Sequence, residues 1–427
     1  MAKLAFVGGK ILDGSERMKP QTGLAVLVDG ERITGLVAAG ETPAEYWKIN
    51  LEGKYLLPGL INMHVHLAGS GKPQKKQRDN AKLVKTIMRS RLTRAAAYKM
   101  VCGFAKDELM SGVTTIRTMG GLGSFDTRLR DEIAAGKRVG PRILAANEGI
   151  SVPGGHMAGS VAIAAHSTEE ALSHLRKAEQ EKTDLIKLMI TGGVLDAKEK
   201  GVPGELKMPP EMVRAVCDEA HRAGYRVAAH AESAEGVLAA LENGVDSIEH
   251  GAQPSERMLQ LFRERGAFLC TTISPALPYA LFDRALTHAT EVEQYNGRVV
   301  FDGIIACARA ALSAGIPVVL GNDVGCPWIT QYDFWRELYY FRKYVGVTNA
   351  FALYTATARS AELAGIGSET GTITAGKAAD MIVTAENPLD DLCALRRVET
   401  VVARGRVVAH PTFRHRKNVE AELDKFL

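Results

Sequence analysis

The feature that most constrains the fold of this 427-residue chain is an alternation of short apolar runs and helical stretches through its middle. Eight runs have the length and the Val, Ile and Leu content of parallel strands buried on both faces. They are LLPGLINMHVH, GVTTIRTMG, PRILAAN, DLIKLMITGG, YRVAAHAES, DSIEHGA, AFLCTTIS and IPVVLGNDVG. Eight such strands within about 300 residues predict an α/β fold, a (β/α)8 TIM barrel over residues 59–369. An open doubly wound sheet is the alternative, but it would need a GxGxxG loop after its first strand, and the sequence has none there.

Two β-rich segments, residues 1–58 and 370–415, flank this region. The first contains KLAFVGGKIL and GLAVLVDGERITGLVA, with the hairpin dipeptide Asp29-Gly30. The second contains VETVVARGRVVAH, which folds back at Arg404-Gly405. Neither segment could bury a core alone, so we expect them to pair as a split β-sandwich domain. Residues 416–427 are expected to form a charged, helical C-terminal tail.

The composition is that of an ordinary globular protein, with 46% hydrophobic and 24% charged residues. This excludes a disordered, collagen-like or disulfide-dense chain. No window holds eighteen consecutive apolar residues, and the first residues lack the pattern of a signal peptide, so no membrane partner is expected. The six cysteines lie far apart without a CxxC pair. A reduced, soluble, cytoplasmic protein is the expectation.

The net charge of +4 is too small to predict nucleic acid as a partner. It is unevenly distributed, because the stretch from Ser70 to Met100 holds ten basic residues and one acidic residue. The basic residues are Lys72, Lys75, Lys76, Arg78, Lys82, Lys85, Arg89, Arg91, Arg94 and Lys99. A solvated helix face explains this stretch most simply, whereas a cationic rim would attract an anionic substrate. The stretch could also serve as a lid or a subunit contact.

Polar side chains recur at the carboxyl ends of the predicted strands, where barrel enzymes keep their active sites. In His64-Val65-His66 the two histidines are two positions apart on a strand, so both side chains point to the same face. Neutral imidazole is the commonest transition-metal ligand. A pair of surface or core histidines would account for this motif alone about as well.

Four further polar residues end or interrupt other strands. Lys187 lies within the apolar run DLIKLMITGG, where a charged lysine is costly to bury without a partner. His230 and His250 each end an apolar run, and one helical segment separates those runs. Asp323 ends the last run as either a helix cap or a ligand and base. Together with the histidine pair they indicate one site.

The chain resembles the metal-dependent amidohydrolase superfamily along essentially its whole length. The motifs that carry the resemblance are PGLINMHVHLAGSGKP, LIKLMITGG, VAAHAES, SIEHGA, LGNDVG and the GKAADMIV of the C-terminal segment. The resemblance implies the barrel with its split sandwich and a centre of two divalent metal ions, usually zinc. In such a centre His64 and His66 would bind the buried ion and Asp323 would complete it. His230 and His250 would bind the outer ion, and Lys187, carboxylated by CO₂, would bridge both.

The chemistry of each residue type agrees with these implied roles. A free ammonium cannot ligate a cation, but a lysine carbamate is in effect a long carboxylate. Two ions about 3.5–4 Å apart can share a hydroxide and polarise a carbonyl. Asp323 would take the proton on attack and pass it to the leaving amine.

Within the superfamily, the residues of these motifs most resemble those of the dipeptidase and imidazolonepropionase-like branch. That branch includes prolidases, Xaa-Arg/Lys dipeptidases and enzymes that cleave N-acyl amino acids. In SVPGGHMAGS, His156 follows two glycines and could bind the substrate carbonyl or carboxylate. Prolidase-like relatives often have a tyrosine at the position of Glu232. If it faces the site, the carboxylate of Glu232 would favour a substrate with a cationic or hydrogen-bond-donating group. Arg117 could bind a carboxylate, or pair structurally with Glu148 or Asp126, and Thr118 replaces an aspartate expected after it.

We therefore predict a metal-dependent hydrolase that cleaves the amide bond of dipeptides or N-acyl amino acids with a free carboxylate. Its partner would be a small-molecule substrate, and the relatives imply a homo-oligomer. Enzymes that hydrolyse ureas, carbamates or cyclic amides would share the ligand set. A deaminase would have an HxxE motif, which His230-Ala231-Glu232 does not match. A non-catalytic barrel would be expected to lack ligands, and none is missing here.

Overall fold

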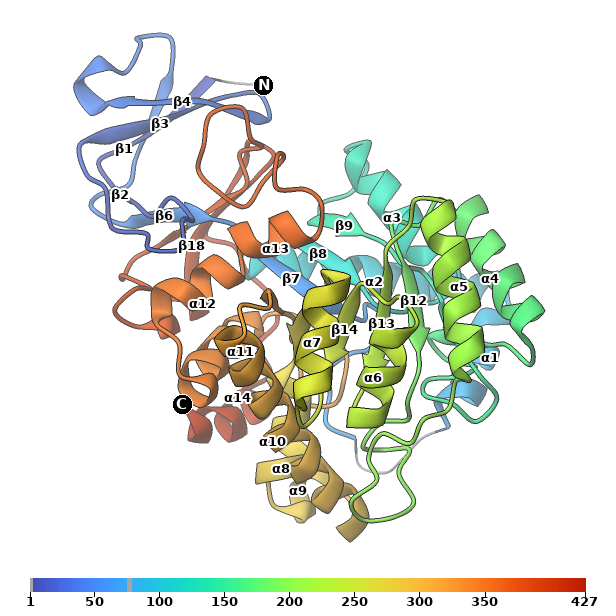
Figure 1. The fold of residues 1–427 in the computed structure, drawn as a ribbon. Helices are drawn as coiled ribbons and strands as arrows, with labels where there is room; N and C mark the ends of the chain where they lie inside the picture. Colours follow the sequence, from blue (N-terminus) through green and yellow to red (C-terminus); the bar gives the residue numbers. More distant parts are fainter. Residues whose placement is uncertain (1–2, 75–78) are drawn as a thin grey trace. The chain divides into compact units, whose positions relative to one another are not determined.

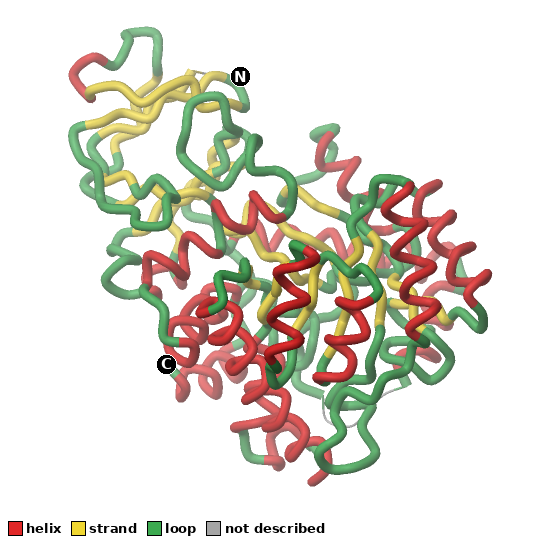
Figure 2. Tube along the Cα trace, viewed as in Figure 1, coloured by secondary structure: helices red, strands yellow, loops and turns green. Residues whose placement is uncertain are grey.

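The computed structural model describes residues 3–74 and 79–427 (Figure 1, Figure 2). The chain divides into two compact units. The terminal unit comprises Met1–Asn62, Ala105–Ile116 and Tyr332–Leu427, and the central unit comprises Met63–Phe104 and Arg117–Gln331. The domain boundaries given by the sequence, 1–58 with 370–415 and 59–369, stay a prediction.

The terminal unit contains two mixed sheets, the second of which is built from both ends of the chain. The first has the order β4 (Arg32–Ala38), β3 (Leu24–Asp29), β1 (Lys3–Val7) and β5 (Trp47–Asn50). The second has the order β19 (Arg406–Ala409), β18 (Val398–Ala403), β17 (Met381–Thr384), β6 (Tyr55–Pro58) and β2 (Lys10–Ile11). β6 and β17 pair antiparallel, and Phe6, Val26 and Met381 belong to one buried apolar cluster. The predicted pairing of the two terminal segments is therefore confirmed.

The last residues of the chain are helical and packed within the terminal unit. Residues 416–427 include α14 (Lys417–Leu423) and a short 3₁₀ turn, with Val419 and Leu423 buried. The Asp424 carboxylate accepts hydrogen bonds from Arg336 at 2.6 Å and from Arg396 at 3.0 Å. The Asp424 charge is thus paired with arginines of other elements of the unit. The remaining helices of the unit are α11 (Phe334–Tyr340), α12 (Asn349–Thr355) and α13 (Ala358–Leu363).

Each of the eight predicted runs contains a strand. Seven strands form one sheet of parallel neighbours, in the order β11 (Ala162–Ala164), β10 (Gly149–Ser151), β12 (Ile186–Met189), β13 (Val227–Ala231), β14 (Ser247–His250), β15 (Phe268–Thr271) and β16 (Val318–Leu320). A second sheet has the order β7 (Leu60–Val65), β8 (Val113–Thr118) and β9 (Arg142–Leu144). An isolated parallel bridge joins Val65 to Val324, just after β16. The α/β fold with a parallel sheet is confirmed, and closure of a single eight-stranded barrel stays a prediction.

Helices connect the parallel strands of the central unit, as its alternating sequence predicts (Figure 2). They are α1 (Asn80–Met88), α2 (Arg91–Met110), α3 (Phe125–Ala134), α4 (Thr168–Gln180), α5 (Pro210–Arg222), α6 (Ala234–Glu242), α7 (Glu256–Arg265), α8 (Ile273–Leu281), α9 (Arg284–Thr287) and α10 (Glu291–Ser313). Side-chain caps fix several helix starts; Ser233, for example, accepts from the Gly236 amide at 3.1 Å. The serine caps of α4, α6 and α7 end the loops that follow β11, β13 and β14, so these loops are fixed where the helices begin. Among the described residues, no helix is long and apolar enough to cross a bilayer.

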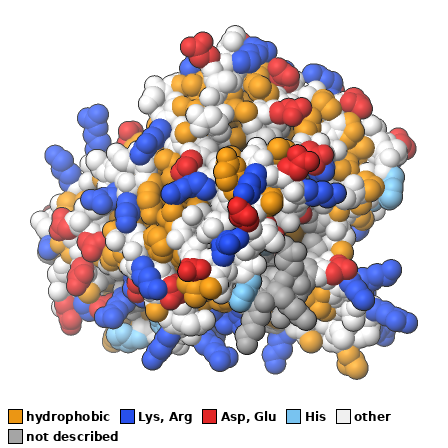
Figure 3. All heavy atoms as spheres, turned by 90° about the horizontal axis from the view of Figure 1, so that it is seen from below, with side chains coloured by type: hydrophobic (Ala, Val, Ile, Leu, Met, Phe, Trp, Pro, Cys, Tyr) orange, Lys and Arg blue, Asp and Glu red, His pale blue; other side chains and the backbone are white. Residues whose placement is uncertain are grey.

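The basic stretch forms part of α1 and α2. Its basic residues among those described, which include Lys82, Arg89 and Arg94, are exposed, and α1 has no buried residue. Lys75, Lys76 and Arg78 lie outside the described residues. The solvated helix face is confirmed for the described part, while a role as a rim, lid or subunit contact stays a prediction. On the face drawn in Figure 3, Lys and Arg side chains are interspersed with acidic and apolar ones.

The six cysteines, all of them among the described residues, are free thiols in the structure.

Asp126, in the first turn of α3, makes the stability of the protein depend on pH. The residue is 1% exposed, and burial raises the pKa of its carboxyl from 3.8 to about 6. Because the folded pKa lies above the unfolded one, the ionised carboxylate destabilises the protein above about pH 6, and the penalty disappears as pH falls toward 4. Asp126→Asn is therefore expected to raise the free energy of unfolding at pH 8 by up to about 3 kcal/mol.

Urea unfolding of the wild type and of Asp126→Asn at pH 8 and pH 4.5 tests this. The gain should fall from about 3 kcal/mol at pH 8 to about 1 kcal/mol at pH 4.5, because part of the buried carboxyl penalty persists until the pH drops below the unfolded pKa. Asp131→Asn, at an exposed position of the same helix, is the control and should show no such gain. Equal gains at both pH values would contradict the expectation.

Candidate metal centre

The histidine pair lies at the end of β7. His64 is the fifth residue of that strand, His66 follows its end, and Val65 between them is fully buried. The alternation of side chains along a strand places both imidazoles on one face, with ring centroids 5.3 Å apart. His64 is 1% exposed and His66 is 8% exposed. The two rings therefore lie together in the interior, as the HxH spacing predicts.

Lys187 lies within β12 and is 1% exposed. Its Nζ has no hydrogen-bond partner among the described residues. Burial lowers the pKa of this amine from 10.5 to about 8, and the negative charges of Glu249 and Asp323 oppose the shift. The neutral amine is therefore far more populated near neutral pH than in an exposed lysine. The neutral amine is the form that reacts with CO₂ to give a carbamate, so the environment of Lys187 favours this reaction.

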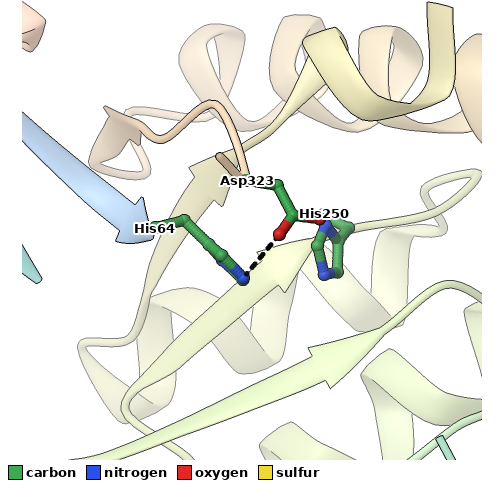
Figure 4. A group of neighbouring side chains, drawn as sticks. All are labelled: His64, His250 and Asp323. Carbon is green, nitrogen blue, oxygen red and sulfur yellow. Dashed lines mark ion pairs between the residues drawn. The ribbon is translucent and has the colours of Figure 1, made fainter. Parts of the chain in front are cut away.

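His230 and His250 reach the same point from adjacent strands. β13 and β14 are parallel neighbours, and the two imidazole centroids lie 4.5 Å apart. The centroid of His250 is 4.9 Å from that of His64. Asp323 completes the group, because its Oδ1 lies 3.6 Å from Nε2 of His64 and 3.3 Å from Nε2 of His66. Figure 4 shows His64 extending from its strand toward Asp323, with His250 beside them.

Two of these residues have left-handed backbone conformations that side chains other than glycine rarely adopt. His250 has φ of 74° and Asp323 has φ of 53°. Such conformations cost of order 1–3 kcal/mol each and persist where the surrounding structure imposes them, commonly at functional sites. The backbone next to Asp323 also packs closely against His64, since a Cβ on Gly321 would lie 2.4 Å from Cβ of His64.

Each imidazole is oriented by a hydrogen bond at one ring nitrogen. Nδ1 of His64 lies 2.8 Å from Oε2 of Glu249, that of His66 lies 2.9 Å from the Gly120 carbonyl, and that of His250 lies 2.6 Å from Oγ1 of Thr272. In His230 it is Nε2 that is bonded, at 3.1 Å, to the carbonyl of Gly192. This is the arrangement that supports metal-binding histidines, in which one nitrogen is held from outside and the other faces the ion.

The electrostatics keep the imidazoles neutral. Burial is the largest cause that lowers the pKa of His64, His230 and His250 well below 6.5, and neighbouring positive groups add to it. The pKa of His66 is also lowered, again first by burial. Neutral imidazole is the form that ligates a metal.

The donor set fits divalent transition-metal ions. Nitrogen and oxygen donors of His64, His250 and Asp323 lie within 4.8 Å of one another, and those of His230, Glu232 and His250 form a second such group. Imidazole with carboxylate suits zinc and its neighbours in the periodic table. The Nζ of Lys187, which has no hydrogen-bond partner in the part of the chain that the structure describes, would as a carbamate add a further carboxylate to the same interior.

Glu249 is a further residue of the candidate site, one that the sequence motifs do not predict. It precedes His250 in β14, is fully buried, and holds His64 through Oε2. Its Oε1 accepts hydrogen bonds from Arg117 at 2.8 Å and from Ser247 at 2.6 Å. The signal was present, since a carboxylate within an apolar strand needs a partner as much as Lys187 does.

The predicted role of Arg117 as a carboxylate anchor is corrected by this arrangement. The side chain is buried, and its guanidinium also donates to the Met63 carbonyl at 2.8 Å and to Ser247. The predicted structural partners were also wrong. Glu148 pairs with Lys177 and Asp126 is buried elsewhere, while Arg117 pairs with Glu249. A guanidinium engaged on each of its nitrogens positions Glu249, and through it His64.

Removing the charge of Glu249 is expected to destabilise the protein, because the Arg117 guanidinium would stay buried without a carboxylate. Glu249→Gln should lower the free energy of unfolding by about 3 kcal/mol. Urea unfolding in the presence of a chelator measures this apart from any effect on metal binding. Glu264→Gln, at an exposed position, is the matched control. A loss for Glu249→Gln no larger than that of the control would contradict a structural role for the pair.

His156 and Glu232 lie beside the histidine cluster. The His156 ring stacks on that of His230, with centroids 4.1 Å apart and planes at 9°, and its Nδ1 lies 2.5 Å from Oδ2 of Asp196. Burial lowers the pKa of His156 while the bond to Asp196 raises it, and the net direction is upward. Glu232 accepts from the Val194 amide at 3.1 Å, and burial raises the pKa of its carboxyl to about 7. Both predicted substrate residues thus lie close to His230.

The fold and these residues define an α/β protein whose candidate site lies at the ends of parallel strands. Residues 55–408 match the model of the amidohydrolase family, and the chain belongs to that family. It is a hydrolase that acts on carbon–nitrogen bonds.

Three relatives illustrate the match. A crystal structure from Bifidobacterium longum, classed as a prolidase, is 35% identical with a TM-score of 0.87 and covers 99% of this chain and 98% of that one. A Xaa-Pro dipeptidase with bound methionine is 28% identical with a TM-score of 0.83, covering 96% of this chain and all of that one. Ochratoxinase of Aspergillus niger is 24% identical over 407 residues, which is 88% of this chain and 80% of the relative.

Proposed function

We propose that this protein hydrolyses the amide bond of dipeptides or N-acyl amino acids that carry a free C-terminal carboxylate, and that it does so with two zinc ions. The observation that carries the proposal is the environment of Lys187. Its Nζ is buried, has no hydrogen-bond partner among the described residues, and lies on a strand that pairs with the strand of His230. The names of the relatives, a prolidase, a dipeptidase and ochratoxinase, support amide substrates of this kind.

The ligands of the proposed centre are the residues gathered at the strand ends. His64, His66 and Asp323 would hold the buried ion and His230 and His250 the outer one, with carboxylated Lys187 shared between them. When bound, the ions supply Lewis acidity at the scissile carbonyl and a nucleophile at neutral pH.

Asp323 is proposed as the proton carrier of the reaction. Its Oδ1 faces both His64 and His66, and no described residue donates a hydrogen bond to that atom. A carboxylate in this position can accept the proton of the attacking water and then deliver it to the leaving amine. One residue thereby serves as base and as acid.

His156 and Glu232 are proposed to bind the substrate. With Nδ1 of His156 occupied by Asp196, Nε2 is the nitrogen that remains to donate to a substrate carbonyl or carboxylate. Glu232 is partly buried beside His156, and because burial raises its pKa to about 7 the carboxyl gains its negative charge as the pH rises through neutrality. We expect Glu232 to favour a substrate with a cationic or hydrogen-bond-donating group.

The test is amine release from a panel of dipeptides and N-acyl amino acids, with zinc-loaded protein and a chelated control. The C-terminal residue should vary across proline, basic, aromatic and aliphatic types. Turnover that the chelator abolishes, on at least one substrate with a free carboxylate, is the expected result. Turnover confined to ureas, carbamates or cyclic amides, offered in a parallel panel, would reject the proposed substrate class.

A further inference from the structure

The segment between β12 and α5 carries an acidic residue that touches the proposed substrate site from outside. Asp196 lies in this segment, and its side chain is 35% exposed. Its Oδ2 lies 2.5 Å from Nδ1 of His156 and also accepts from the Gly193 amide at 2.9 Å. One carboxylate oxygen thus joins the ring of His156 to the backbone just after β12.

We infer that Asp196 is a positioning residue, which fixes the imidazole of His156 so that its Nε2 faces the substrate. The statement that Nε2 faces a substrate rests on the proposed function. The orientation of the His156 imidazole can be measured whether or not that function is correct.

Three contacts determine the orientation of the His156 ring. One face stacks on His230 at 4.1 Å, the Nδ1 edge meets Asp196, and the chain at Gly193 passes close by. A Cβ on Gly193 would lie 2.9 Å from Cε1 of His156, so glycine is required for this approach. A ring held by its face and by one nitrogen cannot flip without losing the hydrogen bond to Asp196. The other nitrogen is therefore presented in a single direction.

The segment that carries Asp196 is itself fastened. Gly192 donates to the Glu205 carbonyl at 2.9 Å, which closes the segment at its base. Asn296 of α10, fully buried, accepts from the Gly201 amide at 2.7 Å and donates to the Glu199 carbonyl at 2.8 Å. Because both ends and the middle are bonded, Asp196 is held in place before any substrate arrives. Such preorganisation is what an effective positioning residue needs.

The first experiment detects the orientation directly. In protein labelled with ¹⁵N at histidine, a proton on Nδ1 of His156 that is bonded to a carboxylate should give a slowly exchanging resonance downfield of the amide region. The resonance is assigned by its loss in His156→Gln. We expect it to disappear in Asp196→Ala and to persist in Glu205→Gln, the control for an acidic side chain of the same segment that pairs with Lys207. Persistence in Asp196→Ala would overturn the inference.

The second experiment is a double-mutant cycle on the best substrate of the panel. Asp196→Asn should lower kcat/KM by about 10- to 100-fold. In the His156→Gln background the same substitution should cost less than about twofold, because a residue that acts through His156 has nothing left to position. A merely structural role of Asp196 would give equal losses in both backgrounds, which would overturn the inference.

A third variant keeps the inference testable if Asp196 variants change the segment more widely. Gly193→Ala displaces His156 while leaving the carboxylate in place, and should also shift or remove the Nδ1 resonance. If the panel finds no amide substrate, the proposed function fails while the resonance experiment still decides whether Asp196 holds His156. If the panel succeeds and the resonance is unchanged in Asp196→Ala, the inference fails alone.

Discussion

Lys187→Ala is expected to bind fewer than two metal ions per chain and to lose amide hydrolysis by at least about 10³-fold, since several kcal/mol of transition-state stabilisation depend on the paired centre. The substitution breaks no hydrogen bond of the folded protein, because Nζ has no partner among the described residues. Circular dichroism should therefore remain that of the wild type. Metal content after gel filtration and the rate on the best substrate are the measurements.

Two further variants separate the chemistry of Lys187 from its packing. Lys187→Met keeps the length of the alkyl chain and fills the space but cannot be carboxylated, so it should behave like the alanine variant. Lys177→Ala removes an exposed lysine, 45% accessible and paired with Glu148, and should behave like the wild type. Two tightly bound ions and full turnover in Lys187→Met would exclude a bridging carbamate.

Asp323→Asn is expected to keep its metal content and to lose about 10²- to 10⁴-fold in kcat, the range typical of a lost general acid or base. The amide has the shape of the carboxylate and retains an oxygen donor, but it cannot take up a proton from the attacking water. Rates and metal content measured on the same preparation distinguish this result from loss of the centre.

A substrate with an activated leaving group makes this prediction sharper. An anilide that leaves as a weakly basic amine has less need of protonation, so Asp323→Asn should lose less on it than on a dipeptide. Asp302→Asn, at an exposed position of α10, is the control and should match the wild type on both substrates. Equal losses on the two substrates would restrict Asp323 to the attack step, and full activity on both would refute its role.

The strand ends could be predicted from sequence because strand periodicity is local. A run such as YRVAAHAES shows by itself where its strand stops, and parallel neighbours bring such ends together. For this reason the sequence predicts one site that contains His64, His230 and His250. In the structure, the ring centroid of His250 lies 4.9 Å from that of His64 and 4.5 Å from that of His230. The pairing of the terminal segments was predictable on similar grounds, since each was too small to form a core alone.

The hydrogen bonds that orient these residues could not be predicted, because they join distant parts of the chain. Glu249 is hydrogen-bonded to His64, 185 positions away in the sequence, and to Arg117, 132 positions away. Nothing in the local sequence pattern selects Glu249 rather than Glu148 as the partner of Arg117. Asp196 meets His156 across 40 positions, through a segment whose course depends on its bonds to α10. The eight predicted runs also leave out β10 and β11, which have three residues each.

The proposed metal ligands lie mainly on strands and the proposed substrate-binding residues lie on connecting segments, and this difference affects how the protein can change during evolution. Lys187, His64 and His250 are anchored within sheets, whereas His156, Asp196 and Glu232 belong to connecting segments. Connecting segments accept substitutions and insertions that a packed strand does not. With the site as proposed, new selectivity can therefore arise by exchange of these connecting segments while the strand residues are kept, and a descendant of this chain could acquire a different substrate while its chemistry stays the same.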